Sequence, residues 1–267
     1  MSSFIEVSTS HQGRVATLCF TDEARQNQLC WAAVDQLADS LRDCRLSGAR
    51  VLILSSGLAR HWFEHAWLDD LCAGLEGRPQ TGTGTGWFCA LDELAHETII
   101  SIAAISGDCA GGGAELAWAC DMRISERHAR FAQIEINAGL TTGIGGCSRL
   151  MRLVGITAVT EMVLTGKALN APRLFELGAV TELVDSGESV DRAQEIAAGL
   201  VQKSPAALAG LKRILRRAED LPLSEALEFE QKTFRDVLNS DGALQAMKVC
   251  QTAYDAGASI AEVHDYD

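Results

Sequence analysis

A buried strand, a glycine run and an apolar helix follow one another within residues 99–121, and this stretch constrains the fold most. Residues 99–105 form an apolar run, which is typical of a strand buried on both faces. Glycines fill positions 111–113, and residues 114–120 predict an apolar helix interrupted by one carboxylate, Glu115. A helix start leaves backbone N–H groups unpaired, and glycine lets a ligand oxygen approach them. The stretch therefore predicts either a site for a negative oxygen beside Glu115 or a tight turn capped by that charge.

Composition limits the classes of protein that the chain can belong to. Its 267 residues are 47% hydrophobic and 22% charged, which is enough for a sizeable core in one large domain or in a domain with an extension. A formal net charge of −13 argues against nucleic acid and against an anionic membrane surface as partners. No segment reaches the length of about 20 apolar residues that a membrane span needs, and no signal peptide is evident. Nine cysteines without a repeated spacing predict reduced thiols in a cytoplasmic protein.

The order of the first elements predicts an α/β fold. Two short strands are expected at residues 4–9 and 14–20, joined by a turn at Gly13. Apolar residues at helical spacing predict a helix over residues 29–44. The apolar run at residues 51–54 then predicts a second buried strand.

The sequence His61-Trp-Phe-Glu64-His65 matches H-x-x-E-H, a zinc-binding pattern of certain peptidases. On a helix the two histidines would share a face, and Glu64 could act as a base. The segment follows directly on the strand at residues 51–54, so we expect a loop that leads into a helix from about Trp67. We therefore predict that no zinc binds here.

Residues 72–86 contain Gly77-Arg78-Pro79 and the repeat Thr-Gly-Thr-Gly-Thr-Gly. Such a composition predicts a mobile loop over a site. A second carboxylate, Glu135, lies among apolar residues 20 positions after Glu115 and just before a glycine-rich turn at residues 142–146. It is either a surface carboxylate at a helix start or a second functional carboxylate beside Glu115.

These pieces together resemble the crotonase superfamily, which comprises the enoyl-CoA hydratases and isomerases. The motifs that carry the resemblance occur in the expected order over nearly the whole chain, namely Ile105-Ser-Gly-Asp-Cys-Ala-Gly-Gly-Gly-Ala-Glu-Leu-Ala, Phe131-Ala-Gln-Ile-Glu135, Gly143-Ile-Gly-Gly146, Leu164-Thr-Gly-Lys167, Leu177-Gly-Ala-Val180 and Lys203-Ser-Pro-Ala206. The resemblance implies a spiral of β-β-α units over residues 1–195. It also implies a helical C-terminal region over residues 196–267, which would serve in assembly as a homotrimer or a dimer of trimers.

The resemblance further implies an active site for an acyl-CoA thioester. The N–H groups of Gly112 and Ala66 would form an oxyanion hole, and Glu115 and Glu135 would be the catalytic pair. It also assigns residues to substrate and coenzyme binding, namely Glu64, His65, Trp67, Gly111 and Gly143. Coenzyme A would enter only as part of the substrate, and neither a metal nor a redox cofactor is expected.

The segment Glu64-His65-Ala66-Trp67 stands where the family usually has Ala-Gly-Ala-Asp. Backbone N–H groups survive such changes, but a β-carbon at His65 is costly if φ is positive there. Three functions therefore stay open: hydration or dehydration of an acyl thioester with both glutamates, isomerisation of a double bond with one carboxylate, and a binding role in a paralogue without activity. The acyl group cannot be read from the sequence, nor can the choice between coenzyme A and a protein-bound carrier.

Overall fold

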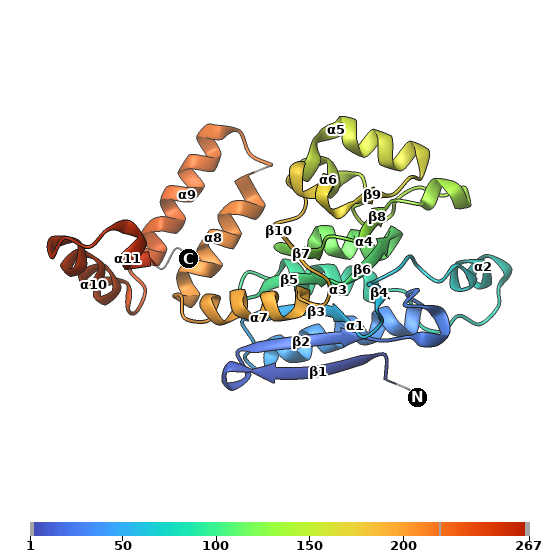
Figure 1. Ribbon diagram of the computed structural model, residues 1–267, viewed down its shortest axis with the longest axis horizontal. Helices are drawn as coiled ribbons and strands as arrows, with labels where there is room; N and C mark the ends of the chain where they lie inside the picture. The colour runs from blue at the N-terminus through green and yellow to red at the C-terminus, as the bar shows by residue number, and fades with distance from the viewer. Residues whose placement is uncertain (1–2, 219, 265–267) are drawn as a thin grey trace. The chain divides into compact units, whose positions relative to one another are not determined.

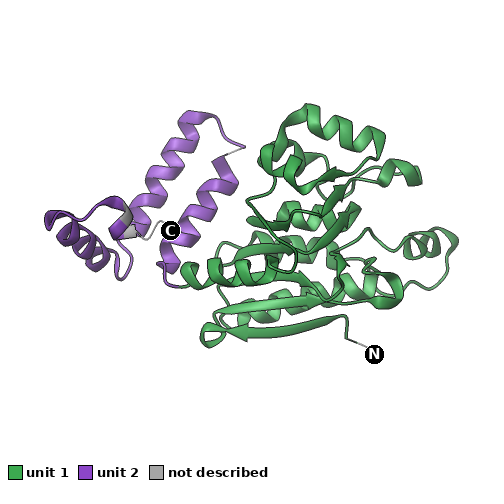
Figure 2. Ribbon diagram, in the orientation of Figure 1, with its two compact units in different colours: residues 1–201 green, residues 202–267 purple. Residues whose placement is uncertain are grey.

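The computed structural model describes residues 3–218 and 220–264, which belong to two compact units (Figure 2). Unit 1 ends at Val201, and unit 2 begins at Gln202. The division expected after residue 195 falls inside helix α7 (Ser189–Leu200). Ala193 and Ala197 of this helix are fully buried, so that α7 packs as one piece within unit 1.

A six-stranded sheet forms the centre of unit 1 (Figure 1). Its strands, in order across the sheet, are β1 (Ile5–Ser10), β2 (Val15–Phe20), β3 (Val51–Ser56), β5 (Ile100–Ile105), β7 (Met122–Glu126) and β10 (Glu182–Val184). β1 and β2 are antiparallel, and the short helix η1 (His11–Gly13) turns the chain between them with Gly13 at φ +80°. The other neighbours are parallel. Both predicted buried strands, β3 and β5, lie in the middle of this sheet, where apolar side chains are needed on both faces.

A second, four-stranded sheet has the order β4 (Arg60–His61), β6 (Gly107–Ala110), β8 (Arg130–Ala132) and β9 (Leu169–Asn170). Strands β3, β5 and β7 of the first sheet lead directly into β4, β6 and β8, which pair in parallel in the same order. Each pair of strands is followed by helical structure, so the chain winds as successive β-β-α turns. The predicted α/β spiral is therefore confirmed.

Helices cover both faces of the six-stranded sheet. On one face Leu52 and Leu54 join a large core with α1 (Trp31–Leu46), α3 (Gly86–Ala95) and α4 (Gly111–Ala119). On the other face Val51 and Ile53 pack in a smaller core with α7. The alternation follows from the two-residue period of a strand. The remaining helices of unit 1 are η2 (Glu23–Arg25), α2 (Leu68–Glu76), η3 (Glu135–Ala138), α5 (Ser148–Thr165) and α6 (Ala171–Glu176).

Two expected elements differ from the structure. The segment predicted as a loop from residue 72 begins inside α2, which continues to Glu76 and ends at Gly77 in the left-handed conformation. The glycine run belongs to the first turn of α4 rather than to a turn before it. The end of α2 contains Ala73, Leu75 and Glu76, which favour a helix by intrinsic propensity. The start of α4 has weak propensity, and close packing against its glycines stabilises the helix there.

Unit 2 consists, over its described residues, of α8 (Pro205–Ala218), α9 (Leu223–Leu238), α10 (Ala243–Asp255) and α11 (Ile260–His264). Its helices α8 and α9 interact, and the Arg217 guanidinium lies 5.5 Å from the centre of the Phe229 ring. Across residues 3–218 and 220–264, no helix is long and apolar enough to cross a membrane.

Candidate active site

A cavity of about 660 Å³ opens beside the start of α4 in unit 1. Five of the residues that the sequence singled out line it: His65, Ala66, Gly111, Gly112 and Gly143. Both predicted carboxylates, Glu115 and Glu135, line it as well. The rest of the wall is mostly apolar and comes from α1, α2, α3 and the region around η3, with the side chains of Trp31, Leu68, Leu71, Trp87, Phe88, Ile134, Leu140 and Ile144.

The three glycines of α4 let two other segments approach the helix closely. A β-carbon at Gly111, whose φ is +47°, would stand 2.9 Å from the β-carbon of His65. At Gly112 it would stand 2.6 Å from the indole ring of Trp87, and at Gly113 it would collide with the carbonyl oxygen of Phe63. The glycine run is therefore required by packing, in addition to any role of its N–H groups.

The segment that carries Ala66 is held by pairing with Leu29. The N–H of Leu29 donates to the carbonyl oxygen of His65, and the N–H of Trp67 donates to that of Leu29, both at 2.9 Å. In such a parallel bridge the N–H of the middle residue, Ala66, points away from the partner strand. Among the described residues, no protein acceptor is recorded for the N–H of Ala66 or of Gly112. Two unpaired donors therefore come from residues that line one cavity.

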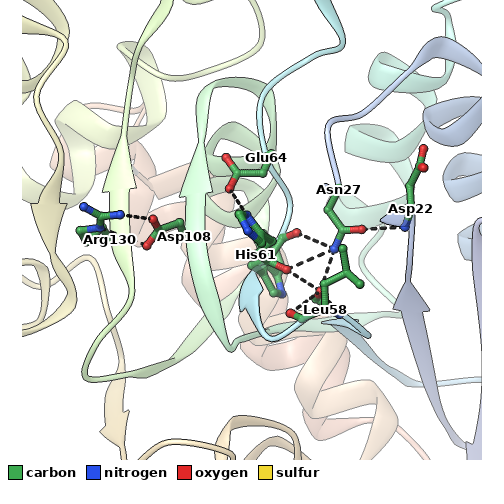
Figure 3. A network of polar contacts seen from close by, with 9 residues as sticks. Asp22, Asn27, Leu58, His61, Glu64, Asp108 and Arg130 are labelled. Carbon is green, nitrogen blue, oxygen red and sulfur yellow. Dashed lines mark hydrogen bonds and ion pairs between the residues drawn. The ribbon is translucent and has the colours of Figure 1, made fainter. Parts of the chain in front are cut away.

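Asn27 also fixes this segment, and no pattern in the sequence marks it for this role. Its side-chain amide is fully buried and donates to the carbonyl oxygens of His61 (3.1 Å) and Trp62 (3.0 Å) (Figure 3). The backbone carbonyl oxygen of Asn27 accepts the N–H of Glu64 at 3.0 Å. Because asparagine tolerates the left-handed conformation, its φ of +59° costs less than it would for most residues. One side chain thus holds an irregular segment of backbone in a fixed path.

The H-x-x-E-H segment is not helical, so its histidines do not share a helix face. His61 Nδ1 lies 3.0 Å from Glu64 Oε1, and His65 Nδ1 lies 2.8 Å from the carbonyl oxygen of Ala66 (Figure 3 shows the first pair). Helix α2 begins at Leu68, close to the predicted start. In the part of the chain that the structure describes, no three His, Cys, Asp or Glu side chains form a group suited to a metal ion.

Of the residues expected to bind substrate or coenzyme, Glu64 and Trp67 do not line the cavity. Glu64 turns to His61, and the Arg25 guanidinium lies 4.6 Å from the centre of the Trp67 ring. His65 does line it, and its φ is not positive, so the side chain that replaces the usual glycine causes no backbone strain.

Glu115 lies on α4 and is only 3% exposed. Its Oε1 accepts the N–H groups of Ile144 (2.9 Å) and Gly146 (2.7 Å). Burial raises the pKa of Glu115 above its ordinary value, against these and neighbouring backbone N–H groups, which lower it. The glycine-rich turn therefore supplies the donors that stabilise a negative charge on this carboxylate.

Glu135 is the first residue of η3 and lies on the same cavity. A β-carbon at Gly111 would be 3.6 Å from Glu135 Oε1, so the carboxylate lies against the start of α4. Burial, opposed by its own backbone N–H and reinforced by the negative charge of Glu115, raises the pKa of Glu135 to about 7. Of the apolar residues on either side of Glu135, Ile134 lines the cavity, whereas Ile136 is 46% exposed.

The Thr-Gly repeat is fastened to the protein by two carboxylates. Asp70, which is 1% exposed, accepts the N–H and the hydroxyl of Thr81 at 2.7 and 2.6 Å and also the N–H of Trp31 at 2.7 Å. Asp35 accepts the N–H of Thr83 at 2.7 Å. The loop is thereby fastened to α2 through Asp70 and to α1 through Asp35. It lies between Trp31 and the start of α3, whose aromatic side chains line the cavity.

Comparison with known proteins agrees with this fold and this cavity. The Enoyl-CoA hydratase/isomerase family model matches residues 10–251. Carnitinyl-CoA dehydratases from Shigella flexneri and Escherichia coli (strain SMS-3-5 / SECEC) are each 35% identical over 201 residues, which is 73% of this chain and 76% of theirs. The structures of enoyl-CoA hydratases from Bacillus anthracis and Polaromonas sp. JS666 match with TM-scores of 0.84 at 23% identity. They cover 95% of this chain and 96% and 97% of their own, and at that identity they show a shared fold.

The spiral fold is that of the crotonase superfamily, and the predicted resemblance is confirmed. The chain belongs to the enoyl-CoA hydratase/isomerase family and is an enzyme of that family.

Proposed function

We propose that the protein is a hydro-lyase that adds water to, or removes it from, the α,β double bond of an acyl thioester. The observation that carries this proposal is the presence of two carboxylates with raised pKa values, Glu115 and Glu135, on one cavity. Both line it together with Ala66 and Gly112. The retained pair favours hydration over chemistry that needs a single carboxylate.

The first step that the site must assist is the build-up of negative charge on the thioester oxygen. When water attacks the β-carbon, the electrons of the double bond move toward the carbonyl oxygen and form an enolate. Two preorganised N–H donors at that oxygen, here those of Gly112 and Ala66, typically stabilise the transition state by several kcal/mol. Asn27 and the Leu29 pairing would keep the second donor in place.

The two carboxylates would then move two protons. Glu115, whose Oε1 already accepts two N–H groups, is assigned the ionised form that takes a proton from the attacking water. Glu135, with a pKa of about 7, is assigned the protonated form that delivers a proton to the α-carbon. Dehydration runs the same steps in reverse, so the singly ionised pair is the active state in both directions.

Coenzyme A is proposed as the carrier, as a part of the substrate, and no step calls for a metal or a redox cofactor. The cavity wall favours an uncharged acyl group, because most of the side chains that line it are apolar. The relatives named carnitinyl-CoA dehydratase make a trimethylammonium-bearing acyl group the second substrate to test. Assembly as a trimer or a dimer of trimers and a cytoplasmic location remain predictions for sedimentation analysis and cell fractionation.

The test is to incubate the purified protein with crotonyl-CoA, longer 2-enoyl-CoAs, 3-enoyl-CoAs and crotonobetainyl-CoA, and to identify the products by mass spectrometry in H₂¹⁸O. Hydration places one ¹⁸O in a 3-hydroxyacyl product. Conversion of 3-enoyl to 2-enoyl substrates without ¹⁸O would instead favour isomerisation. An absence of both products across the panel would contradict the proposal.

A further inference from the structure

Gln133 is fully buried between Glu135 and an indole of α4, and it has no part in the proposed mechanism. It follows β8 directly and lies two residues before Glu135, which begins η3. One end of its amide lies 3.0 Å from Glu135 Oε1, and the other lies 3.2 Å from Trp118 Nε1. A β-carbon on Gly146 would collide with the end of this side chain, so the amide is also enclosed by the turn that binds Glu115.

The chemistry of the two neighbours fixes which way the amide points. The indole Nε1–H of Trp118 can only donate, so it requires the carbonyl oxygen of Gln133 on its side. The NH₂ group then faces Glu135 and donates to Oε1. The reverse orientation would bring two acceptors together at Glu135 and two donors together at Trp118.

We propose that Gln133, oriented by Trp118, is a positioning residue that holds Oε1 of Glu135 with a fixed N–H donor and leaves the other carboxylate oxygen for proton transfer. An N–H donor stabilises the ionised carboxylate, so it opposes the effect of burial on Glu135. Without that donor Glu135 would hold its proton more tightly and would point less uniformly at the substrate. The role in turnover rests on the proposed function, whereas the effect on the titration of Glu135 does not.

Other ionisable groups share the cavity of Glu135 or lie beside its wall. Glu115 from α4 and His65 from the segment before α2 line the same cavity, and the negative charge of Glu115 raises the pKa of Glu135. Arg149 of α5 donates to the carbonyl oxygen of Ile144. These groups are unchanged by a substitution at Gln133, so a change in the titration of Glu135 reports on the amide.

The direct test is ¹³C NMR of the free protein labelled at the glutamate side-chain carboxyl carbon. The Glu135 resonance is assigned by its loss in Glu135→Gln and is then followed over pH in the parent and in Gln133→Met. Methionine fills a similar volume but offers no N–H donor. Loss of a hydrogen bond to a charged group should raise the midpoint by about one pH unit, which is a tenfold weaker acid. An unchanged midpoint overturns the proposal, whatever the substrate of the enzyme.

Two tryptophan variants separate orientation from packing. Trp118→Phe keeps the ring that stacks on Phe131 but removes the indole donor, so the amide can rotate, and the midpoint should rise by less than in Gln133→Met. Trp62→Phe is the matched control, because Trp62 is also buried and no acceptor for its Nε1 is recorded among the described residues. The control should leave the Glu135 midpoint unchanged. If Gln133→Met does not fold, Trp118→Phe decides, and an unshifted midpoint there overturns the orienting role.

Turnover provides a second readout that a merely structural defect would not produce. The singly ionised pair is the proposed active state, so the fall of kcat/KM at high pH reports loss of the second proton. In Gln133→Met this fall should move to higher pH by about the NMR shift, while the maximal kcat decreases about tenfold with a smaller change in KM. A lower kcat with an unmoved pH profile would contradict the proposal. If no substrate is turned over, the NMR result still stands or fails on its own.

Discussion

Replacing Glu135 by glutamine is expected to stabilise the free protein, and only at a pH where the carboxylate must ionise. Burial raises the pKa of Glu135 from 4.5 to about 7, so the folded protein binds this proton more tightly than the unfolded chain does. Stability is therefore lost as pH rises from about 4.5 to about 7, and the full cost is present above that range. At about 1.4 kcal/mol per unit the shift corresponds to about 3 kcal/mol, which partial exposure to solvent reduces to about 1–2 kcal/mol.

The assay is urea unfolding of the parent and Glu135→Gln at pH 5 and pH 8. Tryptophan fluorescence reports on unit 1, because all five tryptophans lie there, namely Trp31, Trp62, Trp67, Trp87 and Trp118. At pH 8 the variant should be more stable by about 1–2 kcal/mol, and at pH 5 by less than about 0.5 kcal/mol. Glu6→Gln, at an exposed position on β1, makes the same chemical change and should show no such difference. Equal effects of Glu135→Gln at both pH values would refute the reasoning.

Three further substitutions test the neighbourhood of the cavity. Gly112→Ala places a β-carbon 2.6 Å from the indole ring of Trp87, so the N–H of residue 112 must move. We expect kcat to fall by about 10²-fold, the usual scale for one oxyanion-hole donor. An unaltered kcat would exclude this N–H from the oxyanion hole. Metal analysis should find far less than one zinc per chain, and near-stoichiometric zinc that disappears in His65→Ala would overturn the prediction for the H-x-x-E-H segment. Asp70→Asn removes a carboxylate oxygen that accepts hydrogen bonds from the Thr-Gly loop, so amide hydrogen exchange over residues 77–86 should become faster. Unaltered exchange would show that these hydrogen bonds do not limit the motion of the loop.

The sequence was sufficient where a feature depends on a local pattern. Apolar runs predicted β3 and β5, because a central strand needs apolar residues on both faces. The order of the motifs predicted the spiral fold, and the two glutamates were placed beside glycine-rich turns that the fold brings to one cavity. The ends of helices were predicted less accurately than their existence: the helix expected over residues 29–44 is α1 at Trp31–Leu46.

Features that depend on contacts between residues far apart in the chain could not be predicted from the sequence. Asn27 meets His61 and Trp62 only after the chain has folded, and no periodicity or spacing marks that meeting. The same holds for Gln133: the motif Phe131-Ala-Gln-Ile-Glu135 contains it, but its contact with Trp118 forms only in the folded chain. The Thr-Gly repeat has the composition of a mobile loop, yet Asp70 fastens it through hydrogen bonds that composition cannot predict. Its closure over a substrate remains a prediction.

The most direct test of the two-carboxylate mechanism is the steady-state rate of hydration by Glu115→Gln, Glu135→Gln and the double variant, on the best 2-enoyl-CoA substrate of the parent. Each single variant should keep the fold, since the side-chain shape is nearly unchanged. Each should lower kcat by about 10² or more, and the double variant should lose little more, because the pair acts as a unit. A mild effect of Glu115→Gln with complete loss in Glu135→Gln would favour isomerase-type chemistry. If both single variants hydrate the substrate at the rate of the parent, the two-carboxylate mechanism is wrong.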